Sequence, residues 1–206
     1  PLTRLPPRRS PRPEPAQAEE LAAAGITHVV SCLHEDHRDK VAFLEERFST
    51  LFVPMRDGMH EDIAGAFPSV VDFVATAGRE AKVLVHCEAG VSRSATLAIA
   101  ILMRRSGGRF YETYCAVRDK RPQVLPNIGF ASQLQKLEIQ LQGARRSARA
   151  AGATPSSLAR YLREVCMVPV DITTLDELLH RHDFDAVKAI RAIFGDEIPR
   201  VVQGAR

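Results

Sequence analysis

The chain has 206 residues, of which 45% are hydrophobic and 26% are charged, and its formal net charge is +3. This is an ordinary globular composition that can bury one good core and a small appendage, and its four cysteines suit reducing surroundings better than a disulfide framework. No secretory signal or apolar run of transmembrane length is visible, so we expect a cytoplasmic or nuclear protein without membrane insertion. The arginine-bearing stretches lack interleaved aromatic residues, so no nucleic-acid binding is expected.

The first half of the chain predicts a sheet covered by helices. Residues 1–15 contain six prolines and are expected to form a flexible Pro/Arg-rich tail. The patterns that follow predict, in order, helix 16–24, strand 26–32, helix 36–47, strand 50–55 and a helical stretch over 61–78. Pro68 should kink or break the last of these. Alternating strands and helices are typical of an α/β fold with a largely parallel sheet.

The second half contains further helices and a change of composition. The expected elements are strand 82–86, helix 92–105, helix 109–120 and a last core helix over 127–141. Residues 143–157 are rich in Ala, Arg, Gly and Ser and predict a linker. Beyond them, short amphipathic helices are expected over 158–167, 175–180 and 185–194, and we assign residues 158–206 to a helical C-terminal extension of unknown role. Its Cys166, His180 and His182 do not form a metal-ligand pattern.

A loop that begins with Cys87 and ends with Arg93 joins strand 82–86 to the helix that follows. Its five intervening residues can wrap backbone N–H groups around a phosphate-sized anion, and Gly90 can adopt the positive φ that such a cradle needs. The helix adds its positive N-terminal end. The predicted phosphate-binding residues are Glu88, Ala89, Gly90, Val91, Ser92 and Arg93.

The Cys–Arg spacing alone is weak, because it occurs three times in this chain. Cys32 is followed by Arg38, but the loop between them has two acidic residues and no glycine, so it would repel a phosphate. Cys115 and Arg121 fall within a helical pattern. Only Cys87 lies where a strand, a loop and a helix meet.

The residues of this loop predict phosphoryl chemistry. Loop amides, a helix N-terminus and a nearby arginine lower the pKa of a thiol, so Cys87 is expected to be a nucleophilic thiolate. The planar fork of Arg93 can bind two phosphate oxygens. Ser94 can donate a hydrogen bond to the sulfur when phosphocysteine breaks down, or else satisfy a backbone N–H at the start of the helix. His86 should face away from Cys87 and support the loop structurally.

The leaving oxygen needs a proton donor, and Asp57 is the candidate. It lies just past strand 50–55, on the side of a parallel sheet where ligands bind. Asp62 is the competing acid, although it has a structural alternative as a helix cap.

Together these residues resemble the dual-specificity branch of the cysteine-dependent protein tyrosine phosphatases. Residues 86–94 are similar to the phosphate-binding loop of that branch, and residues 53–57 to the segment with its general acid. Residues 120–122 and 125–127 look like the family's segment before its last core helix, whose Asn supports the loop, which assigns that role to Asn127. The resemblance covers about residues 20–142, so we assign the catalytic domain to residues 16–142.

The resemblance implies a fold and a reaction. The fold is α/β and protein tyrosine phosphatase-like, with a central, mostly parallel sheet flanked by helices, to which this sequence adds a small C-terminal helical appendage. The reaction is hydrolysis of phosphotyrosine and phosphoserine or phosphothreonine in protein substrates through a phosphocysteine intermediate, without metal or cofactor. Cys87 would be the nucleophile and Asp57 the general acid and base. Where the family usually has an N-terminal strand, this sequence has the Pro/Arg-rich tail, so either the sheet lacks an edge strand or the N-terminus comes from an unusual or truncated gene product.

Other interpretations of the same residues stay open. The same fold could act on a phosphoinositide, an RNA 5′-phosphate or a phosphorylated glycan, although Glu88 in the loop disfavours highly anionic substrates. A non-catalytic module that binds phosphorylated partners and a rhodanese-like sulfur transferase are further alternatives. Oxidation could join Cys32 to Cys87, since both lie near strand ends. The oligomeric state is not predicted.

Overall fold

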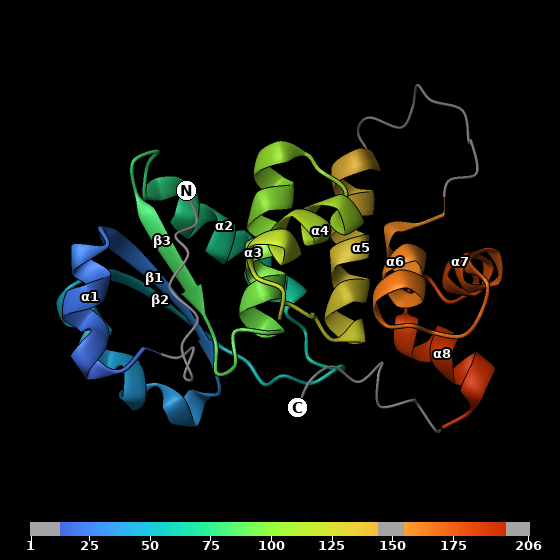
Figure 1. The fold of residues 1–206 in the computed structure, drawn as a ribbon, viewed down its shortest axis with the longest axis horizontal. Coiled ribbons are helices and arrows are strands. Elements are labelled where there is room, and N and C mark those ends of the chain that lie inside the picture. The colour runs from blue at the N-terminus through green and yellow to red at the C-terminus, as the bar shows by residue number, and fades with distance from the viewer. Residues whose placement is uncertain (1–12, 144–154, 197–206) are drawn as a thin grey trace.

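A parallel sheet lies at one end of the chain in the computed structural model, which describes residues 13–143 and 155–196 (Figure 1). Its strands are β1 (Ile26–Leu33), β2 (Ser49–Pro54) and β3 (Lys82–His86), in the order β2-β1-β3. Both neighbouring pairs are parallel, which confirms the predicted α/β class. Because parallel strands end at the same edge, the residues that follow β2 and β3 meet there.

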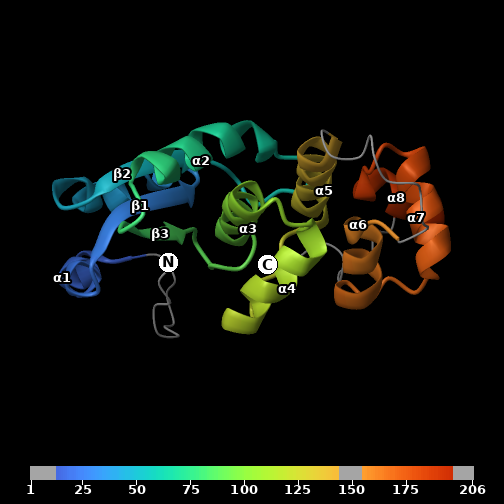
Figure 2. The same ribbon diagram turned by 90° about the horizontal axis from the view of Figure 1, so that it is seen from above.

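Both faces of the central strand β1 are buried. On one face, Val29 and Leu33 pack under α1 (Ala18–Ala23) and the 3-10 helix η3 (Asp39–Glu46). On the other face, Val30 and Cys32 belong to the larger core with α2 (Phe67–Thr76) and α3 (Arg93–Ser106). Figure 2 shows α1 and α2 on opposite sides of the sheet. This alternation follows from the two-residue period of a strand.

The predicted helices on either side of β2 differ from their predictions. The stretch expected as helix 36–47 consists of short 3-10 segments, η2 (Glu35–His37) and η3, rather than an α-helix. Val41 and Leu44 are the buried residues of η3, and their spacing of three is the period of a 3-10 helix. The pattern over 61–78 becomes the 3-10 turn η4 (Ala64–Ala66) followed by α2. Pro68 lies in the first turn of α2, where backbone N–H groups have no acceptor within the helix, so the N–H that proline lacks costs no hydrogen bond.

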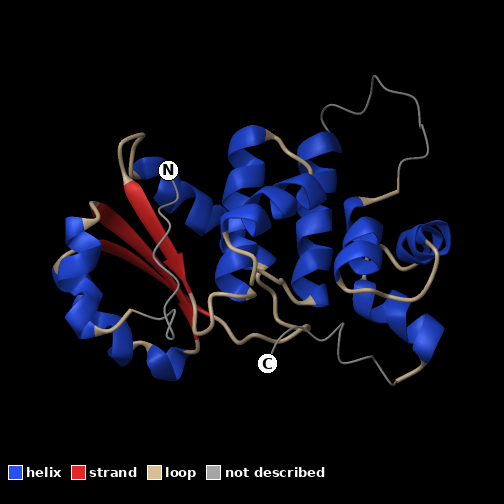
Figure 3. Cartoon of the chain, in the orientation of Figure 1, coloured by secondary structure: helices blue, strands red, loops and turns tan. Residues whose placement is uncertain are grey.

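The middle layer of the molecule consists of α3, α4 (Phe110–Lys120) and α5 (Ile128–Gly143) (Figure 3). Most residues of α3 are buried, as its apolar sequence predicts. It lies between the sheet and α5 and begins where the loop after β3 ends. The same helix therefore carries Arg93 and forms the centre of the core.

The C-terminal helices pack on α4 and α5, on the side away from the sheet (Figures 1 and 2). They are α6 (Ser157–Arg160), which runs directly into the π-helix η6 (Tyr161–Val165), then α7 (Ile172–Arg181) and α8 (Ala186–Phe194). Their buried residues share one core with α3, α4 and α5. Most of the predicted linker over 143–157, and most of the predicted tail over 1–15, fall outside the described residues.

The described part of the chain lacks two kinds of feature. Across residues 13–143 and 155–196, no helix combines the length and the apolar character needed to cross a membrane. The same residues contain no cluster of three or more histidine, cysteine, aspartate or glutamate side chains that could hold a metal ion.

Candidate active site

The phosphate loop, residues 87–93, connects β3 to α3. Gly90 has a φ of +64°, the left-handed conformation that glycine adopts without strain. This turn lets the Gly90 N–H donate to Cys87 Sγ at 3.2 Å, and Ser94 Oγ lies 3.2 Å from the same sulfur. Cys87 is 0% exposed. Hydrogen bonds donated to a sulfur favour its negatively charged form.

Arg93 points back across the loop toward the end of β2. Its Nη1 donates to the carbonyl oxygen of Met55 at 3.1 Å. Its Nε lies 3.6 Å from Asp57 Oδ2, an ion pair too long for a hydrogen bond, and has no hydrogen-bond partner among the described residues. Arg93 is only 9% exposed, and buried donors rarely lack an acceptor. An anion in the loop would supply one.

Asp57 and Asp62 have different surroundings. Asp57 Oδ1 accepts a hydrogen bond from Asn127 Nδ2 at 2.9 Å, while its other oxygen faces Arg93. Asp62 Oδ1 accepts from the N–H of Gly65 at 3.2 Å and so closes the turn before α2. The carboxylate beside the loop is therefore that of Asp57, and Asp62 has the structural contact of a capping residue.

The segment that carries Asp57 rests on α5. A Cβ at Gly129 would lie 1.8 Å from the carbonyl oxygen of Met59, so only glycine permits this close approach. One turn further along α5, Gln133 Nε2 donates to the carbonyl of Glu61 at 2.8 Å, and its Oε1 accepts from Ala64 N at 2.7 Å. Sequence reasoning missed both α5 residues, because their partners are about 70 positions away.

Residues 121–127, which we call the clamp segment, run along the outside of the phosphate loop. Hydrogen bonds join the two: Arg121 Nε to Gly90 O at 3.1 Å, Leu125 N to Val91 O at 2.9 Å and Asn127 N to Ser92 Oγ at 3.1 Å. Asn127 Oδ1 also accepts from Phe130 N at 3.0 Å at the start of α5. Asn127 thus contacts the loop, the acid and the helix. The resemblance included Arg121 in this segment, but its contact with the loop was not predicted.

His86, the last residue of β3, and Glu88, in the loop, contact other parts of the chain. His86 Nε2 lies 2.7 Å from Ser31 Oγ, and both side chains are buried. Ser31 shares a face of β1 with Val29 and Leu33, opposite to the core that contains Cys87. Glu88 Oε2 lies 3.2 Å from His37 Nδ1, and the Glu88 side chain is 43% exposed. His37 is a further neighbour of the loop that the sequence did not indicate.

Cys32 lies in the same core as Cys87 and is 0% exposed. Burial, followed by the nearby charge of Cys87, raises the pKa of Cys32 to about 12. All four cysteines are free thiols, so a Cys32–Cys87 disulfide on oxidation stays a prediction.

Comparison with known proteins identifies the family. Residues 13–140 match the family model described as dual specificity phosphatase, catalytic domain. The chain belongs to the dual specificity phosphatase family. The match ends within α5, so α6, η6, α7 and α8 lie beyond the family's catalytic domain.

Curated relatives and solved structures of dual specificity phosphatases agree with this assignment. The chain is 40% identical over 124 residues to human dual specificity protein phosphatase 14, a match that covers 60% of this chain and 61% of the relative. The structure of human DUSP28 is 30% identical, with a TM-score of 0.55, over 66% of this chain and 97% of that one. The structure of human tyrosine phosphatase-like serine/threonine/tyrosine-interacting protein has a TM-score of 0.59 at 29% identity, in a match that covers 62% of this chain and 85% of that one.

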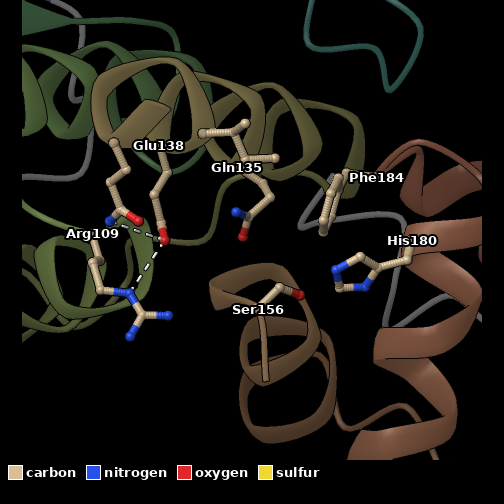
Figure 4. A pocket seen from close by; sticks show the side chains of 8 residues that line it. Arg109, Gln135, Glu138, Ser156, His180 and Phe184 are labelled. Atoms are coloured by element: carbon tan, nitrogen blue, oxygen red, sulfur yellow. Dashed lines mark hydrogen bonds and ion pairs between the residues drawn. The ribbon is translucent and has the colours of Figure 1, made fainter. Parts of the chain in front are cut away.

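A cavity of about 260 Å³ lies away from the phosphate loop, where α5 meets the C-terminal helices (Figure 4). Gln135 and Glu138 of α5 line one side of it, and Ser156, His180 and Phe184 line the other. The buried Glu138 carboxylate accepts from Phe110 N at 2.7 Å and Arg109 Nε at 3.2 Å. The Glu138 carboxylate in the cavity wall therefore holds α4 to α5.

Proposed function

We propose that the chain is a cysteine-dependent protein phosphatase that hydrolyses phosphotyrosine and phosphoserine or phosphothreonine. One observation carries the proposal: the buried Arg93 Nε lacks a hydrogen-bond partner among the described residues, next to the loop that surrounds the Cys87 sulfur. A phosphoryl group over Cys87 would give that donor an acceptor. The backbone N–H groups that would hold its oxygens are those of Glu88, Ala89, Gly90, Val91 and Ser92.

In the first step, Cys87 Sγ attacks phosphorus and the bond from phosphorus to the leaving oxygen breaks. Asp57 gives its proton to that oxygen, and Arg93 neutralises charge on the equatorial oxygens. The products of this step are the dephosphorylated hydroxyl group and phosphocysteine.

In the second step, water attacks phosphocysteine. Asp57, now a carboxylate, takes a proton from the water, the S–P bond breaks and inorganic phosphate forms. The electron pair returns to Cys87 Sγ, where the Gly90 N–H and the Ser94 hydroxyl, both at 3.2 Å, would stabilise the thiolate. Ser94 therefore acts mainly on the second step. His86 and Asn127 support the loop without touching substrate.

Protein phosphoresidues suit this site better than highly anionic phosphates. Glu88 adds a negative charge at the edge of the loop, where it pairs with His37. A phosphoinositide or an RNA 5′-triphosphate would bring additional phosphates near that carboxylate. A phosphopeptide brings one phosphate and a neutral backbone. The proposal extends to a cytoplasmic or nuclear location, since a catalytic thiolate needs reducing surroundings.

The test compares substrates on the purified chain. Phosphotyrosine and phosphothreonine peptides, a phosphoinositide and an RNA 5′-triphosphate are assayed side by side, with Cys87→Ser as the control. Release of phosphate from both peptides, lost in Cys87→Ser, is the expected result. Turnover of the lipid or the RNA in preference to both peptides would move the function to a non-protein substrate. Binding of phosphopeptides without turnover would make the chain a phospho-binding module.

A further inference from the structure

A hydrogen bond joins the C-terminal extension to the clamp segment. Tyr161, the first residue of η6, donates a hydrogen bond from its hydroxyl to the carbonyl oxygen of Pro126 at 2.6 Å. Tyr161 is 0% exposed, and burial holds the pKa of its phenol well above the ordinary value, so the hydroxyl remains an uncharged donor. The extension therefore contacts the residue immediately before Asn127.

The Pro126 carbonyl and the Asn127 N–H belong to the same peptide unit. A trans peptide unit is planar and rigid, with its C=O and N–H pointing in opposite directions. Its carbonyl accepts from Tyr161, and its N–H donates to Ser92 Oγ in the phosphate loop at 3.1 Å. Rotation of this plane would disturb both hydrogen bonds together. The Tyr161 hydroxyl is thus linked to the phosphate loop through a single rigid unit.

Asn127, whose peptide unit Tyr161 contacts, also holds the acid. Asn127 Nδ2 donates to Asp57 Oδ1 at 2.9 Å, so the position of Asn127 affects Asp57 as well as Ser92. The Tyr161 ring makes a separate contact, since it packs edge-on against Tyr114 with centroids 4.9 Å apart. A phenylalanine would fill the same space. The hydroxyl is therefore the part of Tyr161 that can act on the site.

We propose that Tyr161 is a positioning residue through which the C-terminal extension holds the phosphate loop and Asp57 in their catalytic arrangement. This inference rests on the proposed phosphatase function, because it gives a role in that reaction to a residue outside the family's catalytic domain. The extension is then part of the working enzyme rather than an appendage.

Contacts near Tyr161 fix where its hydroxyl lies. Leu158 N donates to Gln135 Oε1 at 2.8 Å, one turn before Tyr161, and Figure 4 shows Gln135 reaching toward the start of α6. From the other side, Ala186 N at the start of α8 donates to Ser132 Oγ at 2.9 Å. Both acceptors are buried polar side chains of α5. Since α5 begins directly after Asn127, extension and clamp segment share one support.

The test removes one hydroxyl at a time from the full chain. Tyr161→Phe deletes the contact with Pro126. The matched control is Tyr111→Phe, because Tyr111 also donates its hydroxyl across the same junction, to Glu164 Oε2 at 2.5 Å, without contacting the clamp segment. For each variant, kcat and KM are measured on p-nitrophenyl phosphate and on a phosphothreonine peptide. Inhibition by inorganic phosphate and the melting temperature are measured as well.

Tyr161→Phe is expected to lower kcat about tenfold, less than the ~10²-fold that a 1 Å misplacement of reacting groups can cost. The loss should be larger for the phosphothreonine peptide, whose leaving group depends more on the acid, and inorganic phosphate should inhibit more weakly. Tyr111→Phe should retain the kinetics and phosphate inhibition of the unaltered chain, although both variants melt earlier. Equal kinetics in the two variants would overturn the inference.

A second measurement needs no variant. If Tyr161 favours the phosphate-binding form of the loop, linkage requires that phosphate binding in turn stabilise the contact with Tyr161. Inorganic phosphate should therefore slow hydrogen exchange in residues 157–165 as well as in the loop. Protection of the loop alone would overturn the inference. An unaltered chain that neither binds inorganic phosphate nor hydrolyses p-nitrophenyl phosphate would instead reject the proposed function.

Discussion

The phosphate loop is held mainly by polar contacts, whereas aromatic packing adds to the hydrogen bonds at the junction of the C-terminal extension with α4 and α5. Around the loop, the buried side chains of Ser92, Arg93 and Asn127 make directional polar contacts with the residue after β2, the clamp segment and α5. At the junction, aromatic rings pack against one another, with Tyr161 and Phe110 centroids 5.3 Å apart. Hydrogen bonds are directional and orient the groups that they join, whereas apolar burial holds two surfaces together without orienting individual groups.

This difference predicts that substitutions in one region affect the rate of turnover and substitutions in the other affect the stability of the fold. Substitutions around the loop should lower turnover with little change in unfolding, and substitutions at the junction should do the reverse. Tyr161 belongs to both regions, because its ring lies in the junction and its hydroxyl contacts the clamp segment. The predictions below test the separation at residues that belong to only one region.

The largest effect is expected at Asp57. Asp57→Asn keeps the shape of the side chain but removes the transferable proton, so kcat should fall by about 10²–10⁴-fold. The melting temperature should change little, because Asn can still accept from Asn127. Asp62→Asn is the control, since an amide oxygen can still accept from Gly65. A greater loss of kcat in Asp62→Asn would mean that the acid is Asp62.

Substitution of Arg93 tests whether a positive charge at this position is enough for catalysis or whether the planar guanidinium fork is needed. Arg93→Lys keeps the charge but loses the planar fork, so kcat/KM should fall by about 10²–10³-fold, the scale for loss of one transition-state donor. Arg121→Lys provides the comparison, because Arg121 contacts the loop from outside, through the carbonyl of Gly90. Steady-state kinetics of both variants should show the much larger loss at Arg93. Equal losses would mean that Arg93 only supports the loop.

Short-range patterns in the sequence predicted most of the sheet side. The strands, the positive φ of Gly90 and the placement of Asp57 beside the loop follow from apolar runs, a glycine and the ends of parallel strands. The pattern over 36–47 indicated a helix, but the choice of 3-10 geometry depended on how Val41 and Leu44 meet the sheet. That meeting is a tertiary contact with no local signal.

The supports of the site could not be predicted for the same reason. Gly129 and Gln133 act on residues about 70 positions earlier, and Tyr161 acts on a residue 35 positions earlier. A helical pattern shows that a helix has an apolar face, but it does not show which surface covers that face. The amphipathic helices of the extension were predicted, whereas their docking on α4 and α5 was not.

Leu158 tests the junction as a source of stability. Its side chain is 0% exposed in the core shared by the extension and α5, so Leu158→Ala should lower the free energy of unfolding by about 2–5 kcal/mol. Turnover by the folded fraction should stay close to that of the unaltered chain. Urea unfolding followed by circular dichroism, with kcat measured well below the melting transition, checks both expectations. A large loss of kcat with unchanged stability would contradict the separation of the two regions.

The smallest effect is the pH dependence of stability that two buried thiols produce, one in each region. Burial is the main cause that raises the pKa of Cys32, in β1, and that of Cys166, in the extension, from 9.0 to about 12. Between those pH values the unfolded chain has released a proton that the folded chain retains, so the unfolded state binds fewer protons. The free energy of unfolding therefore falls as pH rises, by up to about 1.4 kcal/mol per pH unit for each thiol, and this contribution to stability is fully present below pH 9.

Replacing either thiol should flatten that fall, provided that both regions unfold in one transition. Urea unfolding of Cys32→Ala and Cys166→Ala, measured under reducing conditions across the alkaline range, should show the same reduction in slope, and each substitution is the control for the other. Each substitution also lowers the free energy of unfolding at every pH, but this does not affect the comparison, because only the slope of that free energy against pH is compared. A reduced slope for Cys32→Ala alone would mean that the extension separates before the sheet unfolds. The junction would then hold Tyr161 in place more weakly than its buried rings indicate, since aromatic burial would not couple the two regions.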